Sequence, residues 1–157
     1  MDSKGKIDSV SENMRREFKF FKTLSHEELT SFIGFCENKQ IEAGGVLWQE
    51  GDTDNYAAFI LSGKIGIKKK TEFAGKYMIV GTFEKGTVVG ELCLLSDASR
   101  SVTAIIIEDV DLVSLSSNNF ELLLIKYPKL GLKLLKHIFL LTTRRLNKSY
   151  DRIAAIF

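Results

Sequence analysis

The sequence predicts a mainly β domain, a barrel or jelly roll, with helices before and after it. Two patterns among the 157 residues indicate this. Between residues 40 and 116, short runs rich in aromatic and β-branched residues alternate with glycines, which is typical of short strands joined by turns. Outside that range, apolar residues recur with helical spacing. We therefore expect one domain over residues 9–157, large enough to bury a core without disulfides or metals.

Two helices are predicted within residues 9–38. The second begins at a capping box, Ser25 to Glu28, and is expected to run from about His26 to Glu37. Residues 1–8 lack the apolar segment and the cleavage site of a secretory signal, so we expect them to be the flexible terminus of a cytoplasmic protein. The first helix has one apolar face, formed by Val10, Met14, Phe18 and Phe21.

The β region is expected to contain several short strands. Residues 56–61 and 77–80 are rich in aromatic and β-branched side chains and are bounded by glycines. A last pair of strands is predicted over residues 102–108 and 110–115. Glu108-Asp109 is the expected turn between these two strands.

Residues 118–157 are predicted to form a hinge and a long C-terminal helix. A short helix should end at Tyr127, because Pro128 disfavours helix at the residue before it and suits the first turn of the next helix. The next helix is expected to run from about Lys129 to the C-terminus. This long helix is the part of the chain that could extend beyond the barrel.

The long helix contains nearly a coiled-coil seam, with one polar break at Thr142. Its first half could pack on the barrel, whereas its second half would need a partner, and an identical helix is the commonest one. We therefore expect a homodimer. The apolar residues of the seam, three or four apart, are Leu135, Phe139, Leu146, Tyr150, Ile153 and Phe157.

Composition argues against several classes of protein. No apolar run approaches the roughly 20 residues of a membrane span, and a net charge of +2 does not indicate nucleic-acid binding. Cys36 and Cys93 are too few for a disulfide framework or a four-ligand zinc site. His26 and His137 fall in predicted helices, so a metal site of the cupin type inside the barrel is not expected. We find no catalytic constellation and predict no enzyme and no cofactor.

The segment from Val88 to Thr103 has the features of an anion site. Gly90 allows a tight turn, and backbone amides of the following apolar turn can point at an anion. Arg100 can meet two oxygens of a phosphate with its planar guanidinium, and the Ser101 hydroxyl lies next to it. Taken alone, the pattern also allows Glu91 and Arg100 simply to pair with each other.

The same segment resembles the phosphate-binding cassette of cyclic nucleotide-binding domains, as found in the catabolite activator and in protein kinase A regulatory subunits. The pattern Gly45 with Gln49 to Asp52, the run Phe59 to Ile65, and Pro128 extend the resemblance over nearly the whole chain. It implies an eight-stranded jelly roll with N-terminal helices and a C-terminal lid helix. The residues that match the cassette are Gly90, Glu91, Leu92, Leu94, Leu95, Arg100 and Ser101.

The resemblance implies a ligand-binding site that includes Cys93 and Val102. Glu91 would accept a hydrogen bond from the ribose hydroxyl, and Arg100 would bind the cyclic phosphate. The chain departs from the family pattern at several positions, and none of these departures removes a charged group. The proposed ligand contacts are Gly90, Glu91, Leu92, Cys93, Arg100, Ser101 and Val102, and the departures are Val89, Cys93, Ser99 and Val102.

A residue of the long helix closes over the purine in this family. Counting from Pro128 without a gap indicates Arg145, which could stack on the base. Alignment on Arg144-Arg145-Leu146 inserts one helical turn and indicates Ser149 instead. Thr142 is a third candidate.

The expected function is a non-catalytic cyclic nucleotide sensor that changes the position of its C-terminal helix. cAMP is the expected ligand, and cGMP is the alternative ligand. The alternative is a degenerate domain that binds no nucleotide and serves as a dimerisation or docking module. No DNA-binding domain follows the long helix in these residues, so direct DNA binding is not expected. The module would act through an unknown effector protein, either as a whole chain or as a fragment.

Overall fold

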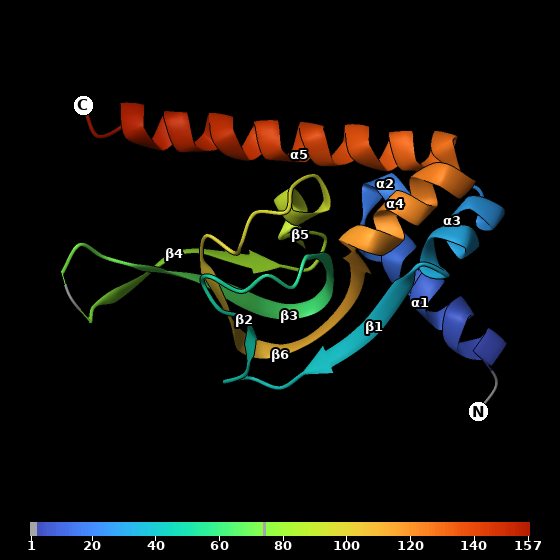
Figure 1. The fold of residues 1–157 in the computed structure, drawn as a ribbon, viewed down its shortest axis with the longest axis horizontal. Helices are drawn as coiled ribbons and strands as arrows, with labels where there is room; N and C mark the ends of the chain where they lie inside the picture. Colours follow the sequence, from blue (N-terminus) through green and yellow to red (C-terminus); the bar gives the residue numbers. More distant parts are fainter. Residues whose placement is uncertain (1–2, 74) are drawn as a thin grey trace.

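The computed structural model describes residues 3–73 and 75–157. Three helices open the chain (Figure 1): α1 (Ser3–Glu17), α2 (Lys19–Lys22) and α3 (His26–Ile33). Phe18 has an extended backbone, φ −118° and ψ 118°, so the first predicted helix is divided in two. Because of this division, the side chains of Phe18 and Phe21 both point into the same core, where their rings lie 5.4 Å apart.

Two predicted boundaries in this region were wrong. Helix α1 begins at Ser3, so it includes most of the segment predicted to be a flexible terminus, of which residues 1–2 lie outside the described residues. Helix α3 has the predicted capping box, with both reciprocal hydrogen bonds between Ser25 and Glu28. It ends at Ile33 rather than Glu37, because the first strand already begins at Cys36.

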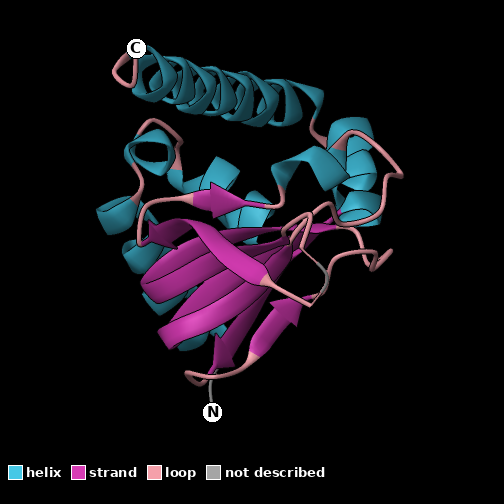
Figure 2. Cartoon of the chain, turned by 90° about the vertical axis from the view of Figure 1, so that its left-hand side faces the viewer, coloured by secondary structure: helices cyan, strands magenta, loops and turns pink. Residues whose placement is uncertain are grey.

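An antiparallel sheet follows, with strand order β1-β6-β3-β4. Strand β2 pairs with β6, and β5 pairs with β3. Figure 2 shows these strands as one curved layer with α5 on one side of it. The strands are β1 (Cys36–Ile41), β2 (Val46–Trp48), β3 (Tyr56–Lys70), β4 (Tyr77–Glu84), β5 (Val88–Val89) and β6 (Thr103–Ser116).

Six strands are present among the described residues, where the resemblance implied eight. Strands β3 and β6 are 15 and 14 residues long, and each runs through a bend that sequence patterns mark as a turn. The predicted turn at Glu108-Asp109 is wrong, because β6 is continuous there. The pairing register between β3 and β6 shifts near Ser62 and Lys64 instead, so the two strands bend together.

The sheet separates two apolar cores. Successive side chains of a strand point to opposite faces, and β3 sends Phe59 toward the helices and Ile60 into the barrel. The helix side is rich in aromatic residues, with the ring of Phe59 5.6 Å from that of Phe21 and 5.5 Å from that of Phe32. This packing explains why the N-terminal helices fold against the β region.

Two helices complete the chain, α4 (Ser117–Lys126) and α5 (Pro128–Ala154). The predicted break at Pro128 is confirmed, and Gly131 allows α5 to approach Leu124 of α4 closely. The first half of α5 packs against the core through the buried side chains of Leu130, Leu134 and Ile138. The second half continues past the helical layer and over β4 (Figure 1). Within the described residues, no helix combines the length and apolar content that a bilayer span requires.

The bend in β3 yields a stability prediction at Gly63. Its φ is +84°, and a Cβ there would overlap the carbonyl oxygen of Asp109 in β6. We expect Gly63→Ala to lower the free energy of unfolding by roughly 2–5 kcal/mol, since left-handed strain and overlap add. The measurement is urea denaturation.

Gly44 provides the matched control, since it has φ +86° and an added Cβ would meet nothing within 4 Å. Gly44→Ala should lower the free energy of unfolding only by the cost of the left-handed backbone, about 1–2 kcal/mol. Equal losses in the two variants would contradict the account of the bend.

Candidate functional site

The site is built on the turn that follows β5. Gly90 has φ +73°, which favours glycine, and it leads into the 3₁₀ helix η1 (Glu91–Leu94). A Cβ on Gly90 would lie 2.5 Å from Nη1 of Arg100 and 2.9 Å from the ring of Trp48. The close approach of backbone, guanidinium and indole therefore depends on the absence of a side chain at this position.

All seven ligand contacts predicted from the sequence line one cavity of about 340 Å³. Trp48 and Phe83 of the barrel and Arg145 of α5 line it as well. The backbone amides of Glu91 and Leu92 precede the first hydrogen bond of the turn, which Cys93 donates to the Gly90 carbonyl. The predicted residues brought together are Gly90, Glu91, Leu92, Cys93, Arg100, Ser101 and Val102.

Arg100 is 4% exposed and is held on every side. Its Nη1 donates to Sγ of Cys93 at 3.1 Å, and its Nη2 donates to the carbonyl oxygen of Tyr56 at 2.8 Å. The guanidinium carbon lies 3.8 Å from the centre of the Trp48 ring and 4.8 Å from that of Tyr56. Nε is buried without a hydrogen-bond partner, and Oδ1 of Asp54 lies 3.9 Å away. The cation thus lies in the corner of two aromatic rings whose planes meet at 81°.

The backbone of Arg100 is fixed by the turn that follows β2. Its N–H donates to the carbonyl oxygen of Asp52, and its carbonyl accepts from the N–H of Gly51, both at 2.8 Å. Next to it, the carbonyl of Ser101 accepts from Nζ of Lys69 at 2.8 Å. The turn predicted from Gln49 to Asp52 therefore positions the arginine of the site.

Cys93 is buried, and its sulfur is an acceptor for Arg100. Burial raises the pKa of the Cys93 thiol, and the nearby Arg100 charge only partly opposes this. The side chain is therefore a neutral thiol at neutral pH, packed against the cation.

Glu91 and Arg100 do not pair with each other. Oε1 of Glu91 instead accepts from Nη1 of Arg145 at 2.8 Å, with side chains 15% and 28% exposed. Arg145 also donates to the carbonyl of Val88, and its guanidinium lies 4.8 Å from the centre of the Phe83 ring. Burial lowers the pKa of Arg145, while Glu91 opposes the shift, and an arginine stays charged. Helix α5 is therefore attached to the site by an ion pair.

The three candidates for closing over a base are placed differently. Arg145 lines the cavity, whereas Thr142 and Ser149 do not. The Thr142 hydroxyl donates to the carbonyl of Phe139 at 2.9 Å, and that of Ser149 donates to the carbonyl of Arg145 at 3.1 Å. Both hydroxyls are thus bound to their own helix.

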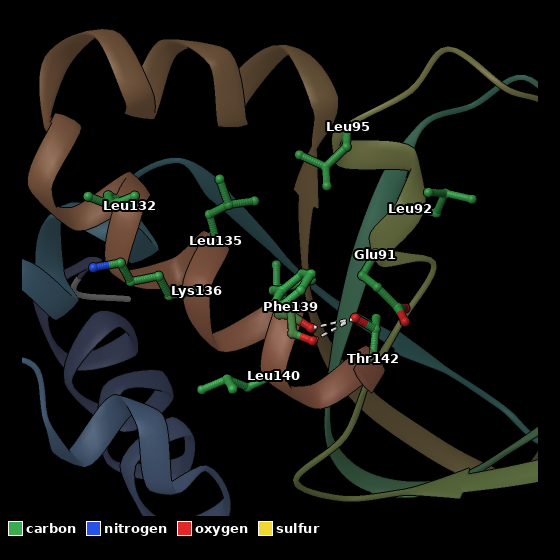
Figure 3. Close-up of a pocket in the computed structure, with 10 residues that line it drawn as sticks. Glu91, Leu92, Leu95, Leu132, Leu135, Lys136, Phe139, Leu140 and Thr142 are labelled. Atoms are coloured by element: carbon green, nitrogen blue, oxygen red, sulfur yellow. Dashed lines mark hydrogen bonds between the residues drawn. The ribbon is translucent and has the colours of Figure 1, made fainter. Parts of the chain in front are cut away.

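An apolar groove of about 880 Å³ lies beside this ion pair, between η1 and α5. Figure 3 shows Leu92 of η1 and Leu95, the residue that follows η1, opposite Leu135 and Phe139 of α5, and Glu91 also lines the groove. Leu92 is 64% exposed and Phe139 is 68% exposed. The groove leaves α5 room to approach η1.

Family comparison agrees with this geometry. Residues 38–127 match the model of the cyclic nucleotide-binding domain. The chain belongs to this family. A cyclic nucleotide-binding domain from Methylobacillus flagellatus is 25% identical, with a TM-score of 0.83, over 94% of this chain and 86% of that one. The regulatory domain of Toxoplasma gondii PKA with cAMP is 27% identical, with a TM-score of 0.63, over 77% of this chain and 45% of that one.

Cyclic nucleotide-binding domains similar to this one also occur within much longer proteins. Human cGMP-dependent protein kinase 2 is 29% identical over 108 residues, which cover 69% of this chain and 14% of the kinase. The chain spans 6–7% of the length of several other curated relatives. Among the described residues, no group of His, Cys, Asp and Glu side chains could hold a metal ion.

Sequence reasoning missed three aromatic residues of the site. Trp48 and Tyr56 stack on Arg100, and Phe83 stacks on Arg145. Trp48 is the only tryptophan of the chain and precedes the turn at Gln49 directly, which was an available signal. For Phe83 the sequence offered no such signal, because it is one of 11 phenylalanines and lies on an exposed strand.

The ion pair predicts that Arg145→Gln loosens the second half of α5. A partly buried pair contributes about 1 kcal/mol, so amide hydrogen exchange over residues 142–154 should become about fivefold faster. Glu91→Gln should have a similar effect. Arg144→Gln is the control, because Arg144 forms no ion pair within the described residues. Unchanged exchange in both test variants would show that the pair does not hold the helix.

Proposed function

We propose that this chain is a non-catalytic cyclic nucleotide sensor whose occupancy is transmitted through α5. The observation that supports it best is the single cavity that gathers Glu91, Arg100 and Arg145 in a chain of this family. Each group suits a different part of a cyclic nucleotide. cAMP is the proposed ligand, in line with the PKA regulatory domain seen with cAMP, and cGMP is the competing one.

The cyclic phosphate would bind near Arg100 and the first amides of η1. A guanidinium and free backbone N–H groups both stabilise a phosphate anion. The ribose hydroxyl would donate to Glu91, whose carboxylate is the only acidic group lining the cavity among the described residues. Phe83 and Arg145 would then face the purine.

Transmission to α5 would follow from competition for Glu91. In the structure Nη1 of Arg145 donates to this carboxylate at 2.8 Å. A ribose hydroxyl that takes its place would release Arg145 from Glu91 and allow α5 to move relative to η1. A ligand shifts such an equilibrium only through its different affinity for the two positions of the helix. The open groove beside the pair provides the space for this motion.

A second candidate function is a degenerate domain that docks or dimerises without nucleotide. It is favoured by Arg100, which is buried and already has Cys93 and Tyr56 as partners. Only the donors that these two contacts leave free, Nε among them, could meet a phosphate without exchange of a contact. Calorimetry with cAMP and with cGMP separates the two functions, because a degenerate domain gives no heat with either at millimolar ligand.

The phosphate site predicts the effect of Arg100→Lys. A lysine cannot bind two phosphate oxygens in a planar fork, and each hydrogen bond to a charged group contributes about 1.5–3 kcal/mol. We expect the affinity for cAMP to fall by roughly 10–150-fold in titration calorimetry. Thermal unfolding would verify that the variant is folded, and Arg16→Lys on α1 is the control. An unchanged affinity would rule out the phosphate site.

We further propose a homodimer formed through the seam of α5. Its residues are well exposed in the single chain: Phe139 is 68%, Leu146 50%, Tyr150 58% and Ile153 56% exposed. Apolar residues at this spacing are typical of helices that pair with another helix. The location we propose is the cytoplasm, where the two free cysteines would stay reduced.

The dimer predicts that Leu146→Glu together with Ile153→Glu shifts the protein to monomer, since two charges would enter an apolar seam. Sedimentation velocity over a concentration series measures this. Asn147→Glu, which changes an exposed position beside the seam, should leave the dimer intact. A wild-type chain that sediments as a monomer at all concentrations would contradict the proposal.

A further inference from the structure

The inner face of α5 changes its chemistry halfway along the helix. The first three residues of this face, Leu130, Leu134 and Ile138, are buried and apolar. Lys148 and Arg152, at the other end of the same face, are exposed. A helix that packs on a sheet along its whole length would continue with apolar residues. The second half of α5 is therefore not built to rest on the sheet. The residues of this face, three or four apart, are Leu130, Leu134, Ile138, Leu141, Arg145, Lys148 and Arg152.

Between this basic half and β4 lies a groove of about 710 Å³. Four consecutive residues of β4, Val80 to Phe83, line it. Successive residues of a strand point to opposite faces, so a lining of consecutive residues means that the strand presents its edge to the groove. Strand β4 is also the last in the sheet order, and its outer edge has no strand partner in the described part of the chain. Figure 1 shows β4 beneath the second half of α5.

The groove is positively charged. Arg144, Lys148 and Arg152 line it, and none of them has an ion-pair partner among the described residues. No acidic side chain belongs to the described lining. His137, at the inner end of the groove, has its pKa lowered first by burial and then by the charge of Arg144. Arg145 is different, because Glu91 neutralises it.

We propose that this groove binds an extended acidic segment of a partner protein, which adds as a strand to the edge of β4. Residues four apart in a helix are about 6 Å apart along its axis, and alternate residues of a strand are about 6.6 Å apart. Acidic residues at every second position of the segment would therefore face Arg144, Lys148 and Arg152 in succession. An unpaired strand edge gives hydrogen bonds that another peptide chain completes in register, which favours a peptide over a nucleic acid or a lipid surface.

The groove and the dimer seam can be occupied together. At 3.6 residues per turn, Lys148 lies about half a turn around the helix from Leu146. The partner segment would thus bind on the side of α5 that faces its own sheet, while a second copy covers the other side. This inference does not depend on nucleotide binding, because Arg144, Lys148 and Arg152 are not among the residues proposed to bind the ligand; Arg145 and Phe83 line both sites.

The test uses the full chain and a labelled synthetic decapeptide of alternating Glu and Thr, followed by fluorescence polarisation. We expect binding that weakens as salt is added, since the cations are exposed. Lys148→Glu with Arg152→Glu should weaken it at least tenfold. Lys126→Glu with Lys129→Glu makes the same change of charge outside the groove and should alter the affinity less than twofold.

Strand addition is tested by methylating the backbone amides of the peptide, which removes donors without changing charge. Alternate residues of an added strand donate to the edge, so methylation of one alternate set should weaken binding at least tenfold and methylation of the other should not. The proposal is overturned if both methylated peptides bind like the parent, or if a peptide with Lys in place of Glu binds equally. Tighter binding of a poly-thymidine oligonucleotide or of phosphatidylserine vesicles would overturn it as well. Calorimetry with cAMP on the same samples reports nucleotide binding separately.

Discussion

The arrangement of the site depends on one buried cation. A charge as enclosed as Arg100 is costly unless its surroundings compensate for lost water. Here the compensation comes from three residues: Trp48 and Tyr56 through their rings, Tyr56 also through its carbonyl oxygen, and Cys93 through its sulfur. Gly90 leaves the space in which they meet. The guanidinium therefore joins the end of β2, the start of β3 and the η1 turn into one unit.

A second cation connects this unit to the helix. Arg145 is carried by α5 and contacts Glu91, Val88 and Phe83, so it joins the C-terminal helix to η1 and β4. The two arginines differ in what holds them. Arg100 is surrounded by residues of β2, β3 and η1, whereas Arg145 lies where the packed half of α5 ends. Of the two, Arg145 can leave its partners with less disturbance to the core.

The sequence was sufficient to predict which residues would meet in the cavity, because Gly90 to Val102 are close in the chain and a single turn brings them together. It was not sufficient to predict contacts that depend on the placement of distant elements. A shift of one helical turn exchanges Arg145 for Ser149, and only packing against η1 decides between them. Likewise, Gly63 gives the same local signal for a turn and for a bend within a strand, so the sequence did not show that expected neighbouring strands join into the long strands β3 and β6.

The position of Trp48 has an optical consequence. It is the chain's only indole, it is 4% exposed, and the cation of Arg100 lies 3.8 Å from its ring centre. A positive charge over an indole alters the energy of its excited state, so emission from this protein depends on where one guanidinium rests. The molecule therefore carries an unlabelled fluorophore at the centre of its site, and movement of Arg100 can be followed in the native chain.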